Sequence, residues 1–224
     1  MLKARKKVTK RQIKEDKLVT TYFKTIDFFN RNSKHVTIGL VAVIAVFVLV
    51  VLFSRSKKTA ELNASEQLTR ANAEISQNNL NQATDILLNM VENYSGTRSA
   101  GNGVYLLAYT YFQKGDYEKA RIHFEKYLDD YAKDPILSSA AYSGLGASLE
   151  QQNKYLEAAQ WYEKGAQKFA DHFNAPQQLL DAGRCYSLAS RMDKAKGCYE
   201  TIIQKYSNST LKSDAELYLA KLKG

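Results

Sequence analysis

Histidine and cysteine are scarce in this chain, which limits the chemistry it can perform. Its 224 residues include three histidines, at positions 35, 123 and 172, and two cysteines, Cys185 and Cys198. None of the histidines has a second ligand at the spacing of a metal-binding motif. We therefore predict no catalytic residues, no metal site and no cofactor, and we do not expect the protein to be an enzyme.

Charge is absent from one long stretch near the N-terminus. Residues 36–53 contain no charged side chain and are rich in valine. As a helix they would span roughly 27 Å, close to the ~30 Å hydrocarbon core of a bilayer. Soluble helices that are apolar on every side over this length are rare. The sequence therefore predicts a transmembrane helix at residues 35–54, followed by a linker at residues 55–61.

Net charge is also absent from most of the chain, although the total is +9. Residues 1–34 hold 11 Lys/Arg against 3 Asp/Glu, whereas residues 56–224 hold 20 of each sign. The excess therefore belongs to a tail beside the apolar stretch, and no motif in it indicates nucleic acid. Because only Arg55, Lys57 and Lys58 follow the stretch closely, the positive-inside rule predicts a cytoplasmic N-terminus. Inverted topology, with the rest of the chain in the cytoplasm, is the alternative.

The tail at residues 1–34 has helical spacing in its second half. Tyr22, Phe23, Ile26 and Phe29 lie on one stripe, with cations elsewhere. An amphipathic helix of this kind next to a membrane is expected to lie in the lipid interface. The alternative is that Tyr22, Phe23 and Phe29 dock onto a membrane partner. The basic residues before this helix are typical of a topology signal that also attracts lipid.

Four segments repeat along the remainder of the chain. Each contains an alanine, and the alanines are 37, 38 and 37 residues apart. Four residues after each alanine stands a large apolar side chain, and twelve residues before it stands a small one. The alanines are Ala83, Ala120, Ala158 and Ala195; the large residues are Leu87, Phe124, Tyr162 and Tyr199; the small ones are Ala71, Ala108, Gly146 and Gly183.

This spacing predicts stacked helix hairpins. Two antiparallel helices approach closely where both present small side chains, and Gly115, or Asn or Ser at the matching position, makes the turn between them. One hairpin cannot bury its apolar face alone, but four stacked hairpins can. We therefore predict an all-α fold, in which the transmembrane helix is followed by a solenoid of about four hairpins and a C-terminal cap helix at residues 209–223.

This pattern of a small residue, an alanine and a large, mostly aromatic residue at fixed spacing resembles the tetratricopeptide repeat over roughly residues 62–208. The usual tryptophan of the first helices is absent, and the closing proline is replaced by Ser95, Ala132, Ala170 and Ser207. The period of 37–38 residues is longer than the usual ~34 and is similar to that of envelope-associated tetratricopeptide proteins of Gram-negative bacteria. The resemblance implies a tetratricopeptide repeat domain at residues 62–224 that binds other proteins.

A second resemblance lies in residues 26–34, which read Ile-Asp-Phe-Phe-Asn-Arg-Asn-Ser-Lys and lead directly into the apolar stretch. This segment is similar to the anchor of the YfgM-like family, ancillary subunits of the bacterial Sec translocon. That resemblance implies a single-pass inner-membrane protein with a periplasmic repeat domain. Its expected partners are translocon subunits, periplasmic chaperones or emerging secretory proteins. An assembly factor of another envelope complex, in division, secretion or respiration, would have the same architecture.

The tetratricopeptide resemblance also implies a binding groove lined by first-helix residues that do not pack in the core. Aromatic groups in such a groove can hold apolar side chains of a peptide, although each could instead pack against a neighbouring helix. If a structure placed Glu150, Arg184 and a histidine together, an enzyme would be favoured instead. The predicted groove residues are Tyr105, Tyr109 and Phe112, then Ser143, Ala147 and Glu150, then Leu180, Arg184 and Leu188.

Cys185 and Cys198 fall in the two helices of the fourth repeat. An oxidising periplasm would permit a disulfide between them, but their geometry cannot be derived from the sequence. Two separate buried thiols are the other interpretation, and the sequence leaves both open.

Overall fold

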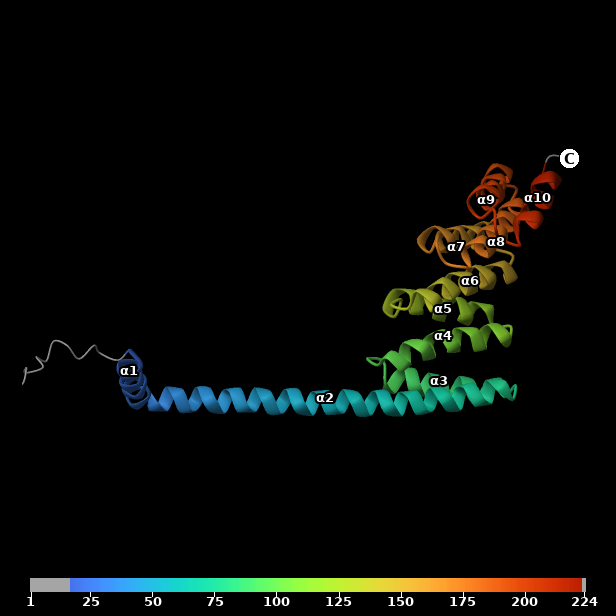
Figure 1. Ribbon diagram of the computed structural model, residues 1–224. Helices are drawn as coiled ribbons and strands as arrows, with labels where there is room; N and C mark the ends of the chain where they lie inside the picture. The colour runs from blue at the N-terminus through green and yellow to red at the C-terminus, as the bar shows by residue number, and fades with distance from the viewer. Residues whose placement is uncertain (1–16, 223–224) are drawn as a thin grey trace, which may run out of the picture. The chain divides into compact units, whose positions relative to one another are not determined.

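A computed structural model describes residues 17–222 of the chain, and within this range it contains helices and no strands. The basic residues before position 17, which form most of the predicted topology signal, lie outside the described residues. Contacts between residues divide the chain into two units, Met1–Ser56 and Lys57–Gly224. The helices are α1 Lys17–Arg31, α2 Ser33–Ser76, α3 Leu80–Asn93, α4 Arg98–Gln113, α5 Tyr117–Asp130, α6 Pro135–Gln151, α7 Tyr155–Lys168, α8 Ala175–Leu188, α9 Met192–Lys205 and α10 Lys212–Lys221 (Figure 1).

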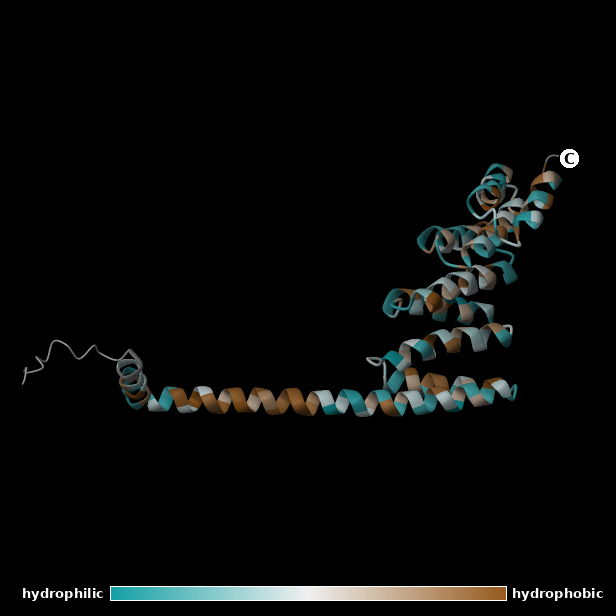
Figure 2. Ribbon diagram, viewed as in Figure 1, coloured by the Kyte–Doolittle hydropathy of each residue, from teal (hydrophilic) through white to brown (hydrophobic). Residues whose placement is uncertain are grey.

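The first unit contains α1 and the apolar part of α2. Figure 2 shows this part of α2 as a nearly continuous hydrophobic segment. It is long and apolar enough to cross a membrane, and none of its residues is buried by protein. In α1, the side chains of Tyr22, Phe23 and Phe29 are exposed.

Residues 55–61, predicted as a linker, are helical and belong to α2. They contain neither glycine nor proline, so nothing in them ends a helix. Glu61 then fixes this part of α2 to the start of α4. Its carboxylate accepts hydrogen bonds from the backbone N–H groups of Arg98 (2.8 Å) and Ser99 (3.1 Å), where the helix dipole favours a negative charge.

The second unit is a stack of helix hairpins, and the predicted all-α solenoid is confirmed. The helix pairs α4 with α5, α6 with α7 and α8 with α9 form hairpins, and α10 packs on α9. The end of α2 and α3 form the first hairpin, with Ala71 and Leu87 in the shared core (Figure 1). Each hairpin contacts the next, as Figure 1 shows for α3 to α9. The second helix of the first three hairpins is followed by a loop of at least four residues that leads into the next repeat.

The turn inside each hairpin uses the residue type that the repeat predicted. Asn78, Gly115, Asn153 and Ser190 all have a positive φ, between 58° and 77°. They occupy the same position in successive repeats. Glycine and asparagine adopt this left-handed conformation readily, whereas serine does so at a cost. The matching polar residues therefore replace glycine as the sequence predicted.

Small residues allow the helices of a hairpin to meet. Ala108, Ala120, Ala158 and Ala195 are fully buried. A Cβ atom at Gly183 would come within 2.4 Å of the Tyr199 ring. The glycine therefore accommodates the aromatic side chain of the partner helix, and this contact sets the distance between α8 and α9.

Both cysteines lie in the fourth hairpin as free, buried thiols. Burial raises the pKa of each thiol, Cys185 and Cys198, to about 12. Of the two interpretations left open by the sequence, the structure has the separate thiols.

Candidate functional site

A groove of about 360 Å³ crosses the first helices of three successive hairpins, α4, α6 and α8. Its aromatic side comes from α4 and α5, its middle from α6, and its polar side from α7 and α8. The lining residues are Tyr105, Tyr109, Phe112, Phe124, Ala140, Ser143, Gly144, Ala147, Tyr162, Asn174, Gln177 and Asp181.

The aromatic side consists of one stripe of α4, because Tyr105, Tyr109 and Phe112 follow one another at helical spacing. Tyr105 packs edge-on against Phe124, with ring centroids 5.7 Å apart, and Phe112 packs edge-on against Tyr117 at 5.3 Å. Burial, followed by the proximity of Tyr109, raises the pKa of Tyr105. Tyr109 itself is 42% exposed. Tyr105 and Phe112 are thus held rigidly by the second helix, while Tyr109 offers its ring to solvent.

The middle of the groove is open because α6 presents small side chains there. Ala140, Ser143, Gly144 and Ala147 lie on this face. A Cβ atom at Gly144 would come within 2.3 Å of the Phe124 ring, so the glycine leaves room for that ring at the base of the groove. Larger residues on this face of α6 would fill the space that a ligand needs.

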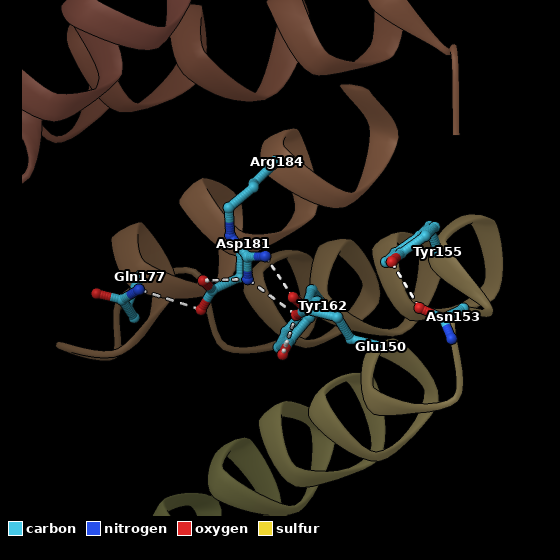
Figure 3. A network of polar contacts seen from close by, with 7 residues as sticks. All are labelled: Glu150, Asn153, Tyr155, Tyr162, Gln177, Asp181 and Arg184. Carbon is cyan, nitrogen blue, oxygen red and sulfur yellow. Dashed lines mark hydrogen bonds and ion pairs between the residues drawn. The ribbon is translucent and has the colours of Figure 1, made fainter. Parts of the chain in front are cut away.

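The polar side is a network of hydrogen bonds and ion pairs between α6, α7 and α8 (Figure 3). The Arg184 guanidinium contacts both oxygens of Glu150, with Nη2 2.8 Å from Oε2, and its Nη2 also lies 3.3 Å from Asp181 Oδ1. Gln177 donates to Asp181 Oδ2 at 3.1 Å, and the Tyr162 hydroxyl lies 3.4 Å from Glu150 Oε2. The network connects the end of α6 to α8 across a repeat boundary.

The two carboxylates of this network have opposite pKa shifts. The hydrogen bonds from Arg184 hold the pKa of Glu150 below its usual range. Burial raises the pKa of Asp181, and its contacts with Gln177 and Arg184 only partly offset that effect. Arg184 therefore mainly stabilises the ionised form of Glu150, and Asp181 remains a poorly solvated acid at the groove.

Five of the nine predicted groove residues line this groove, namely Tyr105, Tyr109, Phe112, Ser143 and Ala147. Glu150 and Arg184 lie at its polar side in the ion-pair network. Leu180 and Leu188 are not among the lining residues, since Leu180 is 9% exposed and belongs to the core, and Leu188 is exposed elsewhere. Leu180 occupies the repeat position of Tyr105 and Ser143, but those two residues are half-buried and line the groove, whereas Leu180 is buried.

Gln177, Asp181 and Asn174 are groove residues that the sequence reasoning missed. Gln177, Asp181 and Arg184 follow one another at spacings of four and three, which places them on one face of α8. This spacing was the signal in the sequence that could have identified the groove face of α8. Asp181 on that face directly follows the predicted residue Leu180.

The structure contains only part of the arrangement of Glu150, Arg184 and a histidine that would favour an enzyme. Glu150 and Arg184 do meet, but the seven-residue network of Figure 3 contains no histidine. His172 is in the α7–α8 loop, where its ring lies 4.3 Å from that of Phe173. Within residues 17–222, no three His, Cys, Asp or Glu side chains are placed to hold a metal ion.

A larger cavity, of about 690 Å³, lies between the α3–α4 and α5–α6 loops. Its charged lining residues are two acids, Asp130 and Asp134, and two bases, Arg98 and Lys133. The Tyr131 hydroxyl donates to the Ser95 carbonyl at 2.7 Å and ties the loops together. With balanced charges and a largely loop-derived wall, this cavity is less suited to hold a ligand than the groove on α4, α6 and α8.

Comparison with known proteins agrees with this architecture. The structure of MamA from strain AMB-1 is similar at 12% identity with a TM-score of 0.53, over 67% of this chain and 77% of that one. A structure of PilF from Pseudomonas aeruginosa is similar at 17% identity with a TM-score of 0.53, over 75% and 69% of the two chains. At these identities the likeness shows the fold alone. The sequence profile of the tetratricopeptide repeat-like domain matches residues 27–223, and the chain therefore belongs to this family.

Proposed function

We propose that this protein is a membrane-anchored scaffold that binds other proteins through the groove on α4, α6 and α8. The observation that carries the proposal is the groove itself, which is bounded by the exposed ring of Tyr109 and by the partly neutralised carboxylate of Asp181. Tetratricopeptide domains bind other proteins, and a fixed aromatic surface loses little conformational freedom on binding.

The anchor in this proposal is the apolar part of α2. Its mean hydropathy and length suit a bilayer, and the basic excess of residues 1–34 favours a cytoplasmic N-terminus. The repeats would then lie in the periplasm of a bacterium, with the anchor in the inner membrane. Confinement to the membrane surface would raise the effective concentration of the groove near membrane partners.

For the partner we propose the Sec translocon and the chaperones or secretory proteins around it. The support is the similarity of residues 26–34 to the YfgM-like anchor, together with the exposed aromatic residues Tyr22, Phe23 and Phe29 of α1. In this arrangement α1 docks on the translocon or lies in the adjoining lipid. The groove then receives a segment of a chaperone or of an emerging chain. Function is mechanical here, because the protein holds partners in place and performs no chemistry.

Photo-crosslinking in intact membranes tests the proposal. A photoreactive amino acid would replace Tyr109 in one variant, Phe29 in a second and Ile122 in a control. Ile122 is 46% exposed on α5, which matches Tyr109, but it lies outside the groove lining. We expect translocon subunits at position 29, and chaperones or secretory proteins at position 109 but not at position 122.

Two results would contradict the proposal in different ways. Identical products at positions 109 and 122 would show that the groove has no special role in binding. Partners from one unrelated envelope complex at positions 29 and 109 would instead identify an assembly factor of that complex. A C-terminal tag that is degraded by protease in inside-out vesicles, but protected in spheroplasts, would establish the inverted topology.

A further inference from the structure

The groove has one charge that is only partly compensated. Among its lining residues in the described part of the chain, Asp181 is the one with a formal charge. The adjoining network adds Glu150 and Arg184, so three charged groups give a net charge of −1. Arg184 makes two contacts with Glu150 and one longer contact with Asp181. Asp181 thus keeps part of its capacity to accept hydrogen bonds.

Asp181 is also placed where a ligand would reach it. Its Oδ2 accepts from Gln177 at 3.1 Å, and both residues line the groove. The Asp181 side chain is only 23% exposed, so water stabilises its charge poorly, and this burial raises its pKa. A cation brought into the groove would supply the stabilisation that water does not provide, because charges attract more strongly in a less polar environment.

The opposite side of the groove has a different character. Tyr105, Tyr109 and Phe112 present ring faces and edges, and Phe124 closes the base. Such rings bind apolar side chains, and their faces also attract cations. One end of the groove thus suits an apolar side chain and the other suits a positive charge, across three successive repeats.

The size of the groove limits its occupant. A volume of about 360 Å³ is at the lower end of the roughly 300–1,000 Å³ typical of ligand pockets. It accommodates a few side chains of a short segment but not a folded element. Its course over α4, α6 and α8 suits a segment that runs from one repeat to the next.

We propose that the groove binds a short protein segment that places an apolar or aromatic side chain on Tyr105, Tyr109 and Phe112, and a lysine or arginine against Asp181. This inference rests on the proposed function of the groove as a protein-binding site, and it names the chemistry of the partner. The segment belongs to another protein, because the groove lies in the unit that the proposed topology separates from this chain's own basic tail.

A peptide array probed with the full-length protein in detergent micelles tests the inference. Each peptide would have ten residues, with Leu or Phe placed one to four positions from Lys, Gln or Glu in a Gly/Ser background. Fluorescence anisotropy would then give Kd values for the peptides retained. We expect Lys peptides to bind about tenfold more tightly than Gln peptides, which is typical of one charge-assisted hydrogen bond, and Glu peptides to bind most weakly.

Three variants separate charge recognition from general binding. Asp181→Asn should remove the preference for Lys, and Asp181→Lys should shift it to Glu. Tyr109→Ala should weaken the Lys and Gln peptides by the same factor. Asp85→Asn, the same charge change at an exposed residue of α3 outside the groove lining, should leave all Kd values unchanged.

The possible failures are distinguishable. Peptides that bind the wild-type protein without a preference for Lys, or with the same preference in Asp181→Asn, would overturn this inference and leave the proposed function intact. A preference for Glu peptides would also overturn it. If no peptide on the array bound the wild-type protein, both the inference and the binding role of the groove would be refuted.

Discussion

The two parts of α2 contain apolar residues in different patterns. Before Ser56, apolar side chains surround the helix and none is buried. After Ser56, the apolar residues Ala64, Leu68, Ala71 and Ile75 form a single stripe, in which the two alanines are fully buried. In the first part the composition matters and the position of each residue does not, as expected for contact with lipid. In the second part the position and size of each residue are decisive, because another helix must fit there.

The largest expected effect is on membrane insertion, and it comes from placing charged side chains in the apolar part of α2. The double substitution Val43→Arg and Val46→Arg should cost roughly 5–7 kcal/mol of insertion free energy, from about 2.5–3.5 kcal/mol for each arginine near the centre of a membrane helix. We expect the membrane-integrated fraction after alkaline extraction to fall severalfold. Leu62→Arg provides the control, since Leu62 is 71% exposed in the second part of the same helix. Equal extraction of the double variant and the wild type would contradict a membrane-spanning role for this stretch.

The substitution of alanine by leucine at three positions of α2 tests how much the position of a residue matters in each part. Ala71→Leu places a larger side chain in a fully buried site and should lower the free energy of unfolding by about 1–3 kcal/mol, as overpacking does. Ala73→Leu, two residues away on the exposed face, and Ala42→Leu in the apolar part should have little effect. Denaturant titration of the detergent-solubilised protein, followed by circular dichroism, measures the difference. Equal destabilisation by all three would show that position does not distinguish the two parts.

The ion-pair network contains two partly buried acids, Glu150 and Asp181, which should respond to pH in opposite directions. The pKa of Glu150 is lowered by Arg184, so its ionised form stabilises the fold above the ordinary carboxyl pKa; this contribution is lost as the pH falls through the lowered value. The pKa of Asp181 is raised by burial, so its ionisation opposes folding. The free energy of unfolding therefore rises as the pH falls from the raised value towards the ordinary one.

Substitution of each acid by its amide tests the opposite pH dependences of the free energy of unfolding. At pH 7, Glu150→Gln should lower the free energy of unfolding by about 1–2 kcal/mol, between the contributions of an exposed ion pair and of a charge-assisted hydrogen bond. That deficit should disappear in acid. Asp181→Asn should instead raise stability at pH 7, and its advantage should shrink as the pH falls. Melting temperatures between pH 3 and pH 8 would measure both, and shifts of the same sign at pH 7 would contradict the assignment.

The sequence was sufficient to predict the solenoid because the repeat constrains particular positions. Ala108 and Gly183 must be small, and Gly115 must allow a positive φ, so these residues reveal the hairpins. The aromatic stripe of α4 was also predictable, because its residues stand at helical spacing. Outward-facing positions have no such constraint. In α8 the repeat position of Tyr105 and Ser143 falls on the core residue Leu180, whereas the groove residue is the neighbouring Asp181.

The ion-pair network could not be predicted for a related reason. Glu150 and Arg184 belong to different repeats and are 34 residues apart, and although each was predicted to lie in the groove, the local sequence does not show that they contact each other. Their contact depends on the distance between α6 and α8. Packing throughout the hairpin between them, including the fit of Tyr162 against Gly146, determines that distance.

The smallest expected effect concerns a position where backbone conformation alone is decisive. Ser190 adopts φ 58° in the turn between α8 and α9, where the second repeat has Gly115 at φ 77°. A left-handed residue other than glycine costs about 1–2 kcal/mol, and glycine's greater freedom in the unfolded chain offsets part of that gain. Ser190→Gly should therefore raise the free energy of unfolding by roughly 0.5–1 kcal/mol, and Tm by about 1–4 °C. Gly115→Ala is the reciprocal control, because a Cβ there meets no atom within 4 Å and only the backbone conformation is strained. It should lower Tm, and a decrease in Tm for Ser190→Gly would show that the serine side chain stabilises this turn by contacts that glycine cannot replace.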